Sequence, residues 1–226
     1  MKEKINLEKG AQEKVWDKIA PFWNKYKTVR VGEKDSLIDD FIDKDDLVLD
    51  AGCGSGRNFY NLGKWKAVDF SSEMVKFSRE KAKEFGMDIE IVKSNLSKLP
   101  FSDGVFDKVL CFATLHCLEE GERKAAVREF ARVLKQGGKI LISVWNKDSK
   151  KWKNKEKEKF VAWALSEGEN GKEEVDDEKF ESESVLRYYY LFNPEELVKL
   201  FELNGFKPIK LNHSKARNIV AIFEKI

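Results

Sequence analysis

A glycine-rich loop directly follows the first apolar run of strand character in this chain. Residues 47–51 (LVLDA) have the composition of a buried strand, and Gly52, Gly54 and Gly56 stand at alternate positions after them. Glycine accepts positive φ and lets a ligand approach the main chain, and a helix starting near Arg57 would offer free N–H groups. The stretch therefore predicts a strand, a tight turn and a helix that cradle a nucleotide-like cofactor.

Short apolar runs alternate with segments of helical period along the rest of the chain. This pattern is typical of an α/β fold, in which a parallel sheet carries helices on both faces. The expected strands are 47–51, 65–69, 89–93, 106–112, 138–145, 206–212 and 218–224. The last two follow each other too closely for a helical crossover, so we expect an antiparallel hairpin there.

Three helices carry recognisable end signals. Ser71 or Ser72 can cap a helix whose inner stripe includes Met74, Phe77 and Phe85. Segment 121–135 ends in LKQGG, where Gly137 suits the positive φ that follows a helix end. The sequence Asn-Pro-Glu-Glu at 193–196 predicts a helix that reaches about residue 204.

Composition narrows the functional classes. The chain has 226 residues, 42% of them hydrophobic, which suits one folded unit. The net charge of +2 among 36% charged residues limits any nucleic-acid contact to a local patch. Three cysteines without paired spacing predict neither a disulfide framework nor a metal site. The unpaired cysteines favour a reducing cytoplasm. The absence of a long apolar run predicts neither secretion nor membrane insertion.

The spacing of the glycines separates two kinds of nucleotide loop. A dinucleotide loop would have Gly-x-Gly-x-x-Gly, whereas here the third glycine comes one position early and Arg57 holds the expected place. A P-loop would end in Gly-Lys-Ser/Thr, which is absent. Asp69, at the end of the next strand, stands about where a ribose-binding carboxylate belongs. A ligand-free glycine turn is the alternative.

The glycine loop, VLDAGCGSGRN, is followed by three further stretches of the pattern: AVDFSSEMV, SNLSKLPFSDGVFDKVLCFATLHCL and EFARVLKQGGKILISVW. Together they resemble the class I S-adenosylmethionine-dependent methyltransferases over residues 45 to 146. The resemblance implies a Rossmann-like, seven-stranded, mostly parallel sheet whose last strand is antiparallel, with S-adenosylmethionine as cofactor. It implies cofactor contacts from Asp50, Gly52, Gly54, Gly56, Asp69, Phe70, Asn95, Leu96 and Phe112. In the family Asp69 would bind the ribose hydroxyls, and the amide oxygen of Asn95 would accept from the adenine amino group.

The ends of the chain resemble one branch of that family. VWDKIAPFWNKYKTVR, LHCL and VLRYYYLFNPEELVKLFELNGF are similar to the tRNA methyltransferases that esterify 5-carboxymethyluridine at the wobble position. The likeness implies the tRNA anticodon loop as substrate and a small zinc-binding activator protein that pairs with the sheet edge. It also implies that the substrate is positioned by Arg30, His116, Arg187, Tyr188 and Tyr189.

The chemistry agrees with this branch and leaves two alternatives open. A carboxylate is ionised at neutral pH, so its methylation needs no general base, and the chain has only two histidines. The fourth strand lacks the Asn/Asp-Pro-Pro-Tyr signature of amine methylation, and no Pro-Cys pair is present for attack on a pyrimidine. The alternatives are a small-molecule O- or C-methyltransferase of a quinone or lipid pathway, and a catalytically idle S-adenosylmethionine-binding partner protein.

We expect a single domain over residues 1–226. It would comprise a cofactor-binding core (45–146), a charged insertion with the substrate side (147–190), and a C-terminal helix and hairpin (191–226). Residues 147–159 hold seven lysines, three acids and Trp152. They could bind phosphates and stack on a base, but the solvated face of an exposed helix is favoured. Residues 167–183, with nine acids, should lie away from RNA or be disordered.

Overall fold

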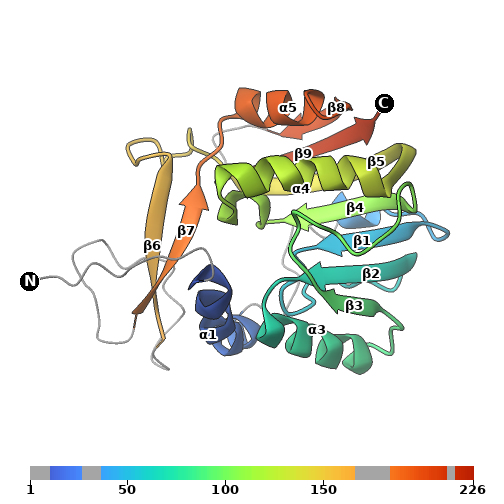
Figure 1. Ribbon diagram of the computed structural model, residues 1–226, viewed down its shortest axis with the longest axis horizontal. Coiled ribbons are helices and arrows are strands. Elements are labelled where there is room, and N and C mark those ends of the chain that lie inside the picture. Colours follow the sequence, from blue (N-terminus) through green and yellow to red (C-terminus); the bar gives the residue numbers. More distant parts are fainter. Residues whose placement is uncertain (1–10, 27–36, 166–183, 213–216) are drawn as a thin grey trace, which may run out of the picture.

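The computed structural model describes residues 11–26, 37–165, 184–212 and 217–226. Its centre is a seven-stranded sheet, shown in Figure 1, with the strand order β3-β2-β1-β4-β5-β9-β8. The strands are β1 (Leu47–Ala51), β2 (Lys64–Asp69), β3 (Glu90–Lys93), β4 (Phe106–Phe112), β5 (Leu134–Trp145), β8 (Phe206–Asn212) and β9 (Asn218–Lys225). The first five run parallel, and β9 runs antiparallel to both β5 and β8. The predicted sheet and its C-terminal hairpin are confirmed.

Helices cover both faces of the sheet. Helices α4 (Glu120–Val133) and α5 (Pro194–Glu202) pack on one face through residues such as Phe130 and Phe201. Helix α3 (Ser72–Glu84) and residues 37–42 cover the other face. Helix α1 (Ala11–Tyr26) lies against α3 near the carboxyl ends of the strands (Figure 1). Each parallel strand is therefore buried between two layers, which explains its continuous apolar sequence.

The sequence predicts the first residues of the helices better than the last ones. Ser71 caps α3, and its hydroxyl accepts from the Met74 amide at 3.1 Å. Asn193 opens α5 with a reciprocal bond pattern to Glu196. The expected end of α4 is wrong: the helix stops at Val133, and β5 starts at Leu134 instead of 138. Gly137 does have positive φ (73°), but it lies within this strand.

One side chain and one helix differ from expectation on the α3 side of the sheet. Phe85 follows α3 and is 50% exposed, so it does not belong to the inner stripe. Within the described residues no helix starts near Arg57, because turns occupy 54–58 and β2 already begins at Lys64. The short connection leaves no room for a helical crossover, so no helix N-terminus follows the glycine loop.

A second, two-stranded sheet occupies the charged insertion. Strands β6 (Glu158–Ala164) and β7 (Ser184–Tyr190) pair antiparallel, with Lys159 opposite Tyr189 and Val161 opposite Arg187. The expectation of an exposed helix at 147–159 is wrong, since these residues form turns that lead into β6. Figure 1 shows this sheet beyond the carboxyl ends of the parallel strands, beside α1. It therefore adds a wall on the side where ligands bind in such sheets.

None of the helices within the described residues combines the length and apolar character needed to cross a membrane.

Candidate functional site

The glycine loop forms the floor of a pocket at the carboxyl end of β1. Gly52 and Gly54 both have positive φ, 82° and 54°. A Cβ on Gly52 would lie 2.3 Å from the Thr114 side chain, so packing requires glycine there. A Cβ on Gly54 would meet only Trp23 and Met74, at 3.8 and 4.0 Å. Gly54 therefore leaves its main chain open to a ligand.

Asp69 lies beside this loop at the end of β2. Its two carboxylate oxygens accept from the Gly54 and Ser71 amides at 2.9 and 3.0 Å, and its exposed fraction is 7%. Burial raises the pKa of Asp69 to about 6, against the hydrogen bonds from Ser71 and Gly54 that lower it. Each oxygen keeps a second lone pair, so the carboxylate can still accept from a pair of vicinal hydroxyls.

The pocket collects most of the predicted cofactor residues. Its lining includes Gly52, Gly54, Asp69, Phe70, Asn95, Leu96 and Phe112. Asp50 and Gly56 stand behind this lining. Asp50 is fully buried and accepts from the Asn58 amide at 3.3 Å, while Asn58 itself faces the pocket. The role of Asp50 is therefore to hold Asn58 and the loop.

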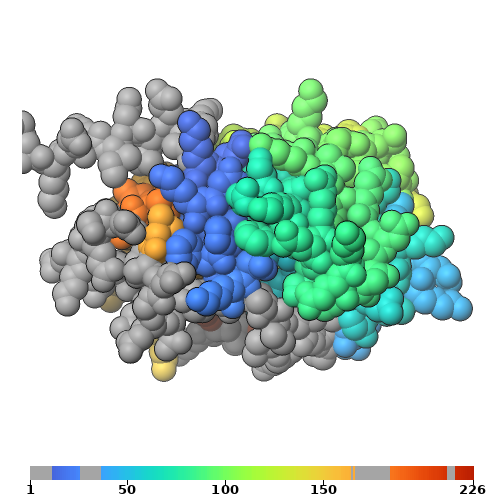
Figure 2. Space-filling model, turned by 90° about the horizontal axis from the view of Figure 1, so that it is seen from below, coloured from blue at the N-terminus to red at the C-terminus, as the bar shows by residue number. Residues whose placement is uncertain are grey.

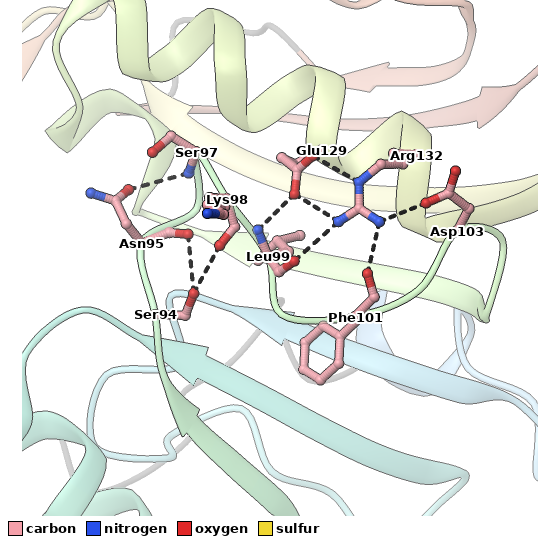
Figure 3. A network of polar contacts seen from close by, with 9 residues as sticks. All are labelled: Ser94, Asn95, Ser97, Lys98, Leu99, Phe101, Asp103, Glu129 and Arg132. Carbon is pink, nitrogen blue, oxygen red and sulfur yellow. Dashed lines mark hydrogen bonds and ion pairs between the residues drawn. The ribbon is translucent and has the colours of Figure 1, made fainter.

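The segment after β3 carries Asn95 and is braced from α4. In Figure 3, the Asn95 side-chain oxygen accepts from the Ser97 amide at 3.2 Å and retains capacity for a second donor. Arg132 donates to the carbonyls of Phe101 and Leu99 at 2.7 and 3.0 Å. Glu129 accepts from both Arg132 and the Leu99 amide. These charge-assisted bonds fix the loop that positions Asn95.

Helix α1 covers the pocket from outside. Trp16 and Trp23 line it and contact each other edge to face, with ring centroids 5.8 Å apart. Asp17 accepts from the Ser71 hydroxyl at 2.6 Å and from the Glu73 amide at 3.2 Å, which ties α1 to the start of α3. Figure 2 shows α1 between α3 and the β6–β7 sheet. These α1 residues were not among the predicted cofactor contacts, and their signal was the tryptophan-rich VWDKIAPFW.

A second group of side chains adjoins the pocket on the side of the β6–β7 sheet. The short 3-10 helix η1 (Leu115–Cys117) places His116 against Trp145, with ring centroids 5.0 Å apart and planes 25° apart. Tyr189 stacks on Trp145 at 4.0 Å. The Arg187 guanidinium lies 4.9 Å from the Tyr189 ring. We call His116, Trp145, Arg187 and Tyr189 the acceptor cluster.

Arg187 gives the acceptor cluster its positive charge. Arg187 is 1% exposed, and its Nε and Nη2 atoms have no partner within the described part of the chain. Burial and the neighbouring Arg187 charge lower the pKa of His116 to about 3, so this imidazole is neutral. A buried guanidinium with free N–H groups favours an anionic ligand.

Cofactor pocket and acceptor cluster share walls. Trp16 lines the pocket and lies 5.7 Å from the Arg187 guanidinium, and Cys117 lines the pocket next to His116. Burial raises the pKa of the Cys117 thiol to about 12, so this side chain is no nucleophile at neutral pH. An anion held by Arg187 would therefore approach the cofactor without a competing thiolate.

Of the two remaining predicted substrate residues, only Tyr188 falls within the described residues, and it lies outside the acceptor cluster. Tyr188 is on the opposite face of β7, where its hydroxyl accepts from Arg123 and donates to Glu158, both at 3.1 Å. Strand alternation separates it from Arg187 and Tyr189. Arg30 lies outside the described residues. Trp145 was not predicted as a site residue, although it is the last residue of the stretch EFARVLKQGGKILISVW.

Comparisons with known proteins agree with this geometry. The model of a methyltransferase domain family matches residues 49–142. A protein of Encephalitozoon cuniculi with a provisional methyltransferase name is 31% identical over 84% of this chain and 83% of its own length. The tRNA (carboxymethyluridine(34)-5-O)-methyltransferase of Arabidopsis thaliana is 28% identical over 64% of this chain, which spans 35% of that relative.

A solved structure shares the fold. An SAM-dependent methyltransferase of Methanosarcina mazei aligns with a TM-score of 0.65 and 21% identity, covering 84% of this chain and 97% of that one. The pocket suits S-adenosylmethionine by its own chemistry as well. Gly54 leaves room beside the main chain, Asp69 can accept from ribose hydroxyls, and Asn95 can accept from an amino group.

The raised pKa of Asp69 predicts that cofactor affinity depends on pH. Ribose hydroxyls need the ionised carboxylate, so binding should be full above pH 7 and weaken as the pH falls through about 6. At pH 5 the Kd for S-adenosylmethionine should be about tenfold higher than at pH 7.5. Isothermal titration calorimetry measures this directly.

The Asp69→Asn variant lacks the ionised carboxylate and does not titrate. It should therefore bind S-adenosylmethionine weakly at both pH values. Asp88→Asn, at an exposed site away from the pocket, is the matched control and should keep the wild-type profile. Equal affinity of wild type and Asp69→Asn at pH 7.5 would contradict the ribose contact.

Proposed function

Because this chain belongs to the class I S-adenosylmethionine-dependent methyltransferases, we propose that it methylates the carboxylate of 5-carboxymethyluridine at the tRNA wobble position. The observation that carries the proposal is the buried Arg187 guanidinium, whose Nε and Nη2 lack partners among the described residues. A carboxylate satisfies such a group in charge and in shape. The name of the Arabidopsis relative supports the same acceptor.

The bound cofactor supplies an electrophilic methyl group on a sulfonium. The acceptor carboxylate forms the new C–O bond, and the C–S bond breaks with its electron pair going to sulfur, so the products are a methyl ester and a thioether. No proton leaves the acceptor. This fits the site, because neutral His116, with its pKa near 3, has no role as a base at neutral pH.

Arg187 and the aromatic rings around it then position the acceptor. Arg187 holds the oxygen that does not attack, since a cation on the attacking oxygen would weaken it as a nucleophile. Trp145 and Tyr189, 7% and 2% exposed, stack on each other and form an apolar wall beside Arg187. Trp16 and Trp23 exclude water from the space between acceptor and cofactor. The protein thereby contributes alignment and desolvation.

The acceptor is tested by mass spectrometry of nucleosides after incubation of the protein with tRNA and labelled S-adenosylmethionine. We expect the label in a carboxymethyl ester of uridine. Label in a lipid extract would indicate the small-molecule alternative, and binding without transfer would indicate a non-catalytic partner protein. Either outcome would overturn the proposed acceptor.

Arg187→Gln should lower kcat/KM for a carboxymethyluridine stem-loop by about 10- to 100-fold, the usual value of a hydrogen-bonded buried charge. Arg187→Lys keeps the charge and should recover part of the loss. Exposed Arg128 on α4 is the matched control, and Arg128→Gln should leave kcat/KM unchanged. Unaltered kcat/KM in Arg187→Gln, with normal cofactor binding, would refute the carboxylate contact.

We also propose that a small zinc-binding activator protein pairs with the β3 edge of the sheet. The other edge strand, β8, is poorly suited because Pro208 lacks an N–H and Lys207 and Lys210 are exposed. At β3, the Arg79 side chain donates to the Ile91 carbonyl at 2.9 Å, a bond that an added strand would replace. The purified chain alone should show low tRNA activity, and a monomer with full activity would refute the partner.

A further inference from the structure

The basic segment, residues 147–159, forms compact turns after β5 and ends with the first two residues of β6. The Trp152 and Lys153 amides both donate to the Ser149 carbonyl, at 3.0 and 2.9 Å, and the Lys155 amide donates to the Trp152 carbonyl at 2.9 Å. The backbone therefore holds itself in one conformation. A structured turn presents its lysines at defined places, unlike a mobile charged tail.

Positive charge dominates the outer surface of the basic segment. Asp148 accepts from the Asn193 amide at 3.2 Å, and Glu158 accepts from the Tyr188 hydroxyl, so two of the three acids are engaged. Lys150, Lys153 and Lys155 are exposed, and no ion pair involves them within the described residues. These three ammonium groups are available to an external anion.

Trp152 connects the basic segment to the acceptor cluster. Its ring is 2% exposed, lies 4.7 Å from the Lys151 ammonium, and stacks on Trp145 at 4.8 Å and 20°. Trp145 in turn stacks on Tyr189. The expectation that Trp152 could stack on a base is therefore wrong. Its ring instead lies between the lysines of the basic segment and Trp145 of the acceptor cluster.

We propose that the basic segment binds the phosphate backbone of RNA next to the nucleotide held in the acceptor cluster. This inference rests on the proposed function and adds the surface that positions the substrate. Lysines act as point charges toward phosphate and read no sequence, so the contact should be electrostatic and independent of the bases. RNA is favoured over a membrane because residues 147–159 expose no large apolar side chain.

The test replaces Lys150, Lys153 and Lys155 together by Glu. Binding of a fluorescent anticodon stem-loop RNA is measured by anisotropy at 50 and 200 mM salt. With three phosphate contacts, wild-type affinity should fall about 20-fold more than that of the variant over this range. In turnover, the variant should raise the KM for RNA more than it lowers kcat.

The matched control replaces Lys44, Lys64 and Lys83 by Glu. These three exposed lysines lie toward the amino ends of the parallel strands, away from the basic segment. The control variant makes the same change in net charge and should keep wild-type affinity and salt dependence. Equal RNA affinity in the two triple variants would overturn the inference. The inference would also be overturned if the Lys150, Lys153 and Lys155 variant lost binding to phosphatidylserine vesicles but kept RNA binding. That result would indicate a membrane-binding surface.

Failure of the proposed function can be told apart from failure of this inference. RNA binding is measured without methyl transfer, so it is readable even if no methyl ester forms. Absence of ester with lysine-dependent RNA binding would refute the carboxymethyluridine acceptor alone. Ester formation with lysine-independent RNA binding would refute the basic segment alone.

Discussion

The buried carboxylate of Asp69 is the contact on which the cofactor side of the molecule depends. It receives the Gly54 amide from the glycine loop and the Ser71 amide from the start of α3. Ser71 in turn donates its hydroxyl to Asp17 of α1. Burial makes the charge of Asp69 costly, and these backbone donors are what keep a carboxylate tolerable there. The carboxylate of Asp69 thus connects the glycine loop to the start of α3, and through Ser71 to helix α1.

Helix α1 extends this connection to the acceptor cluster. Gln12 donates to the Leu186 carbonyl at 3.3 Å and accepts from the Tyr188 amide at 3.1 Å, as a neighbouring strand would. Trp16 lies between the pocket and Arg187. One helix therefore contacts both the pocket and β7, and displacement of α1 would disturb the pocket and the acceptor cluster at once.

Prediction from sequence succeeded where local chemistry decides the structure. Alternation of apolar runs and helical segments was enough for the seven-stranded sheet, and the hairpin followed from the short gap before β9. The tight turn after β1 could be predicted from the conformational freedom of its glycines alone. Prediction from sequence failed at Arg57, where turns replace the expected helix. The chain between β1 and β2 is too short for a helix, whatever the local sequence favours.

What the sequence by itself determined is the pocket half of the candidate site: Gly52, Gly54, Asp69 and Asn95 occur at strand ends, and parallel strands bring their carboxyl ends to one edge. Only the tertiary structure decided the acceptor half. His116 and Arg187 are distant in sequence, and the β6–β7 pairing that buries them depends on contacts between remote segments. The same burial gave Trp152 and its lysines their places, since a charged sequence cannot show which of its aromatic rings the fold will cover.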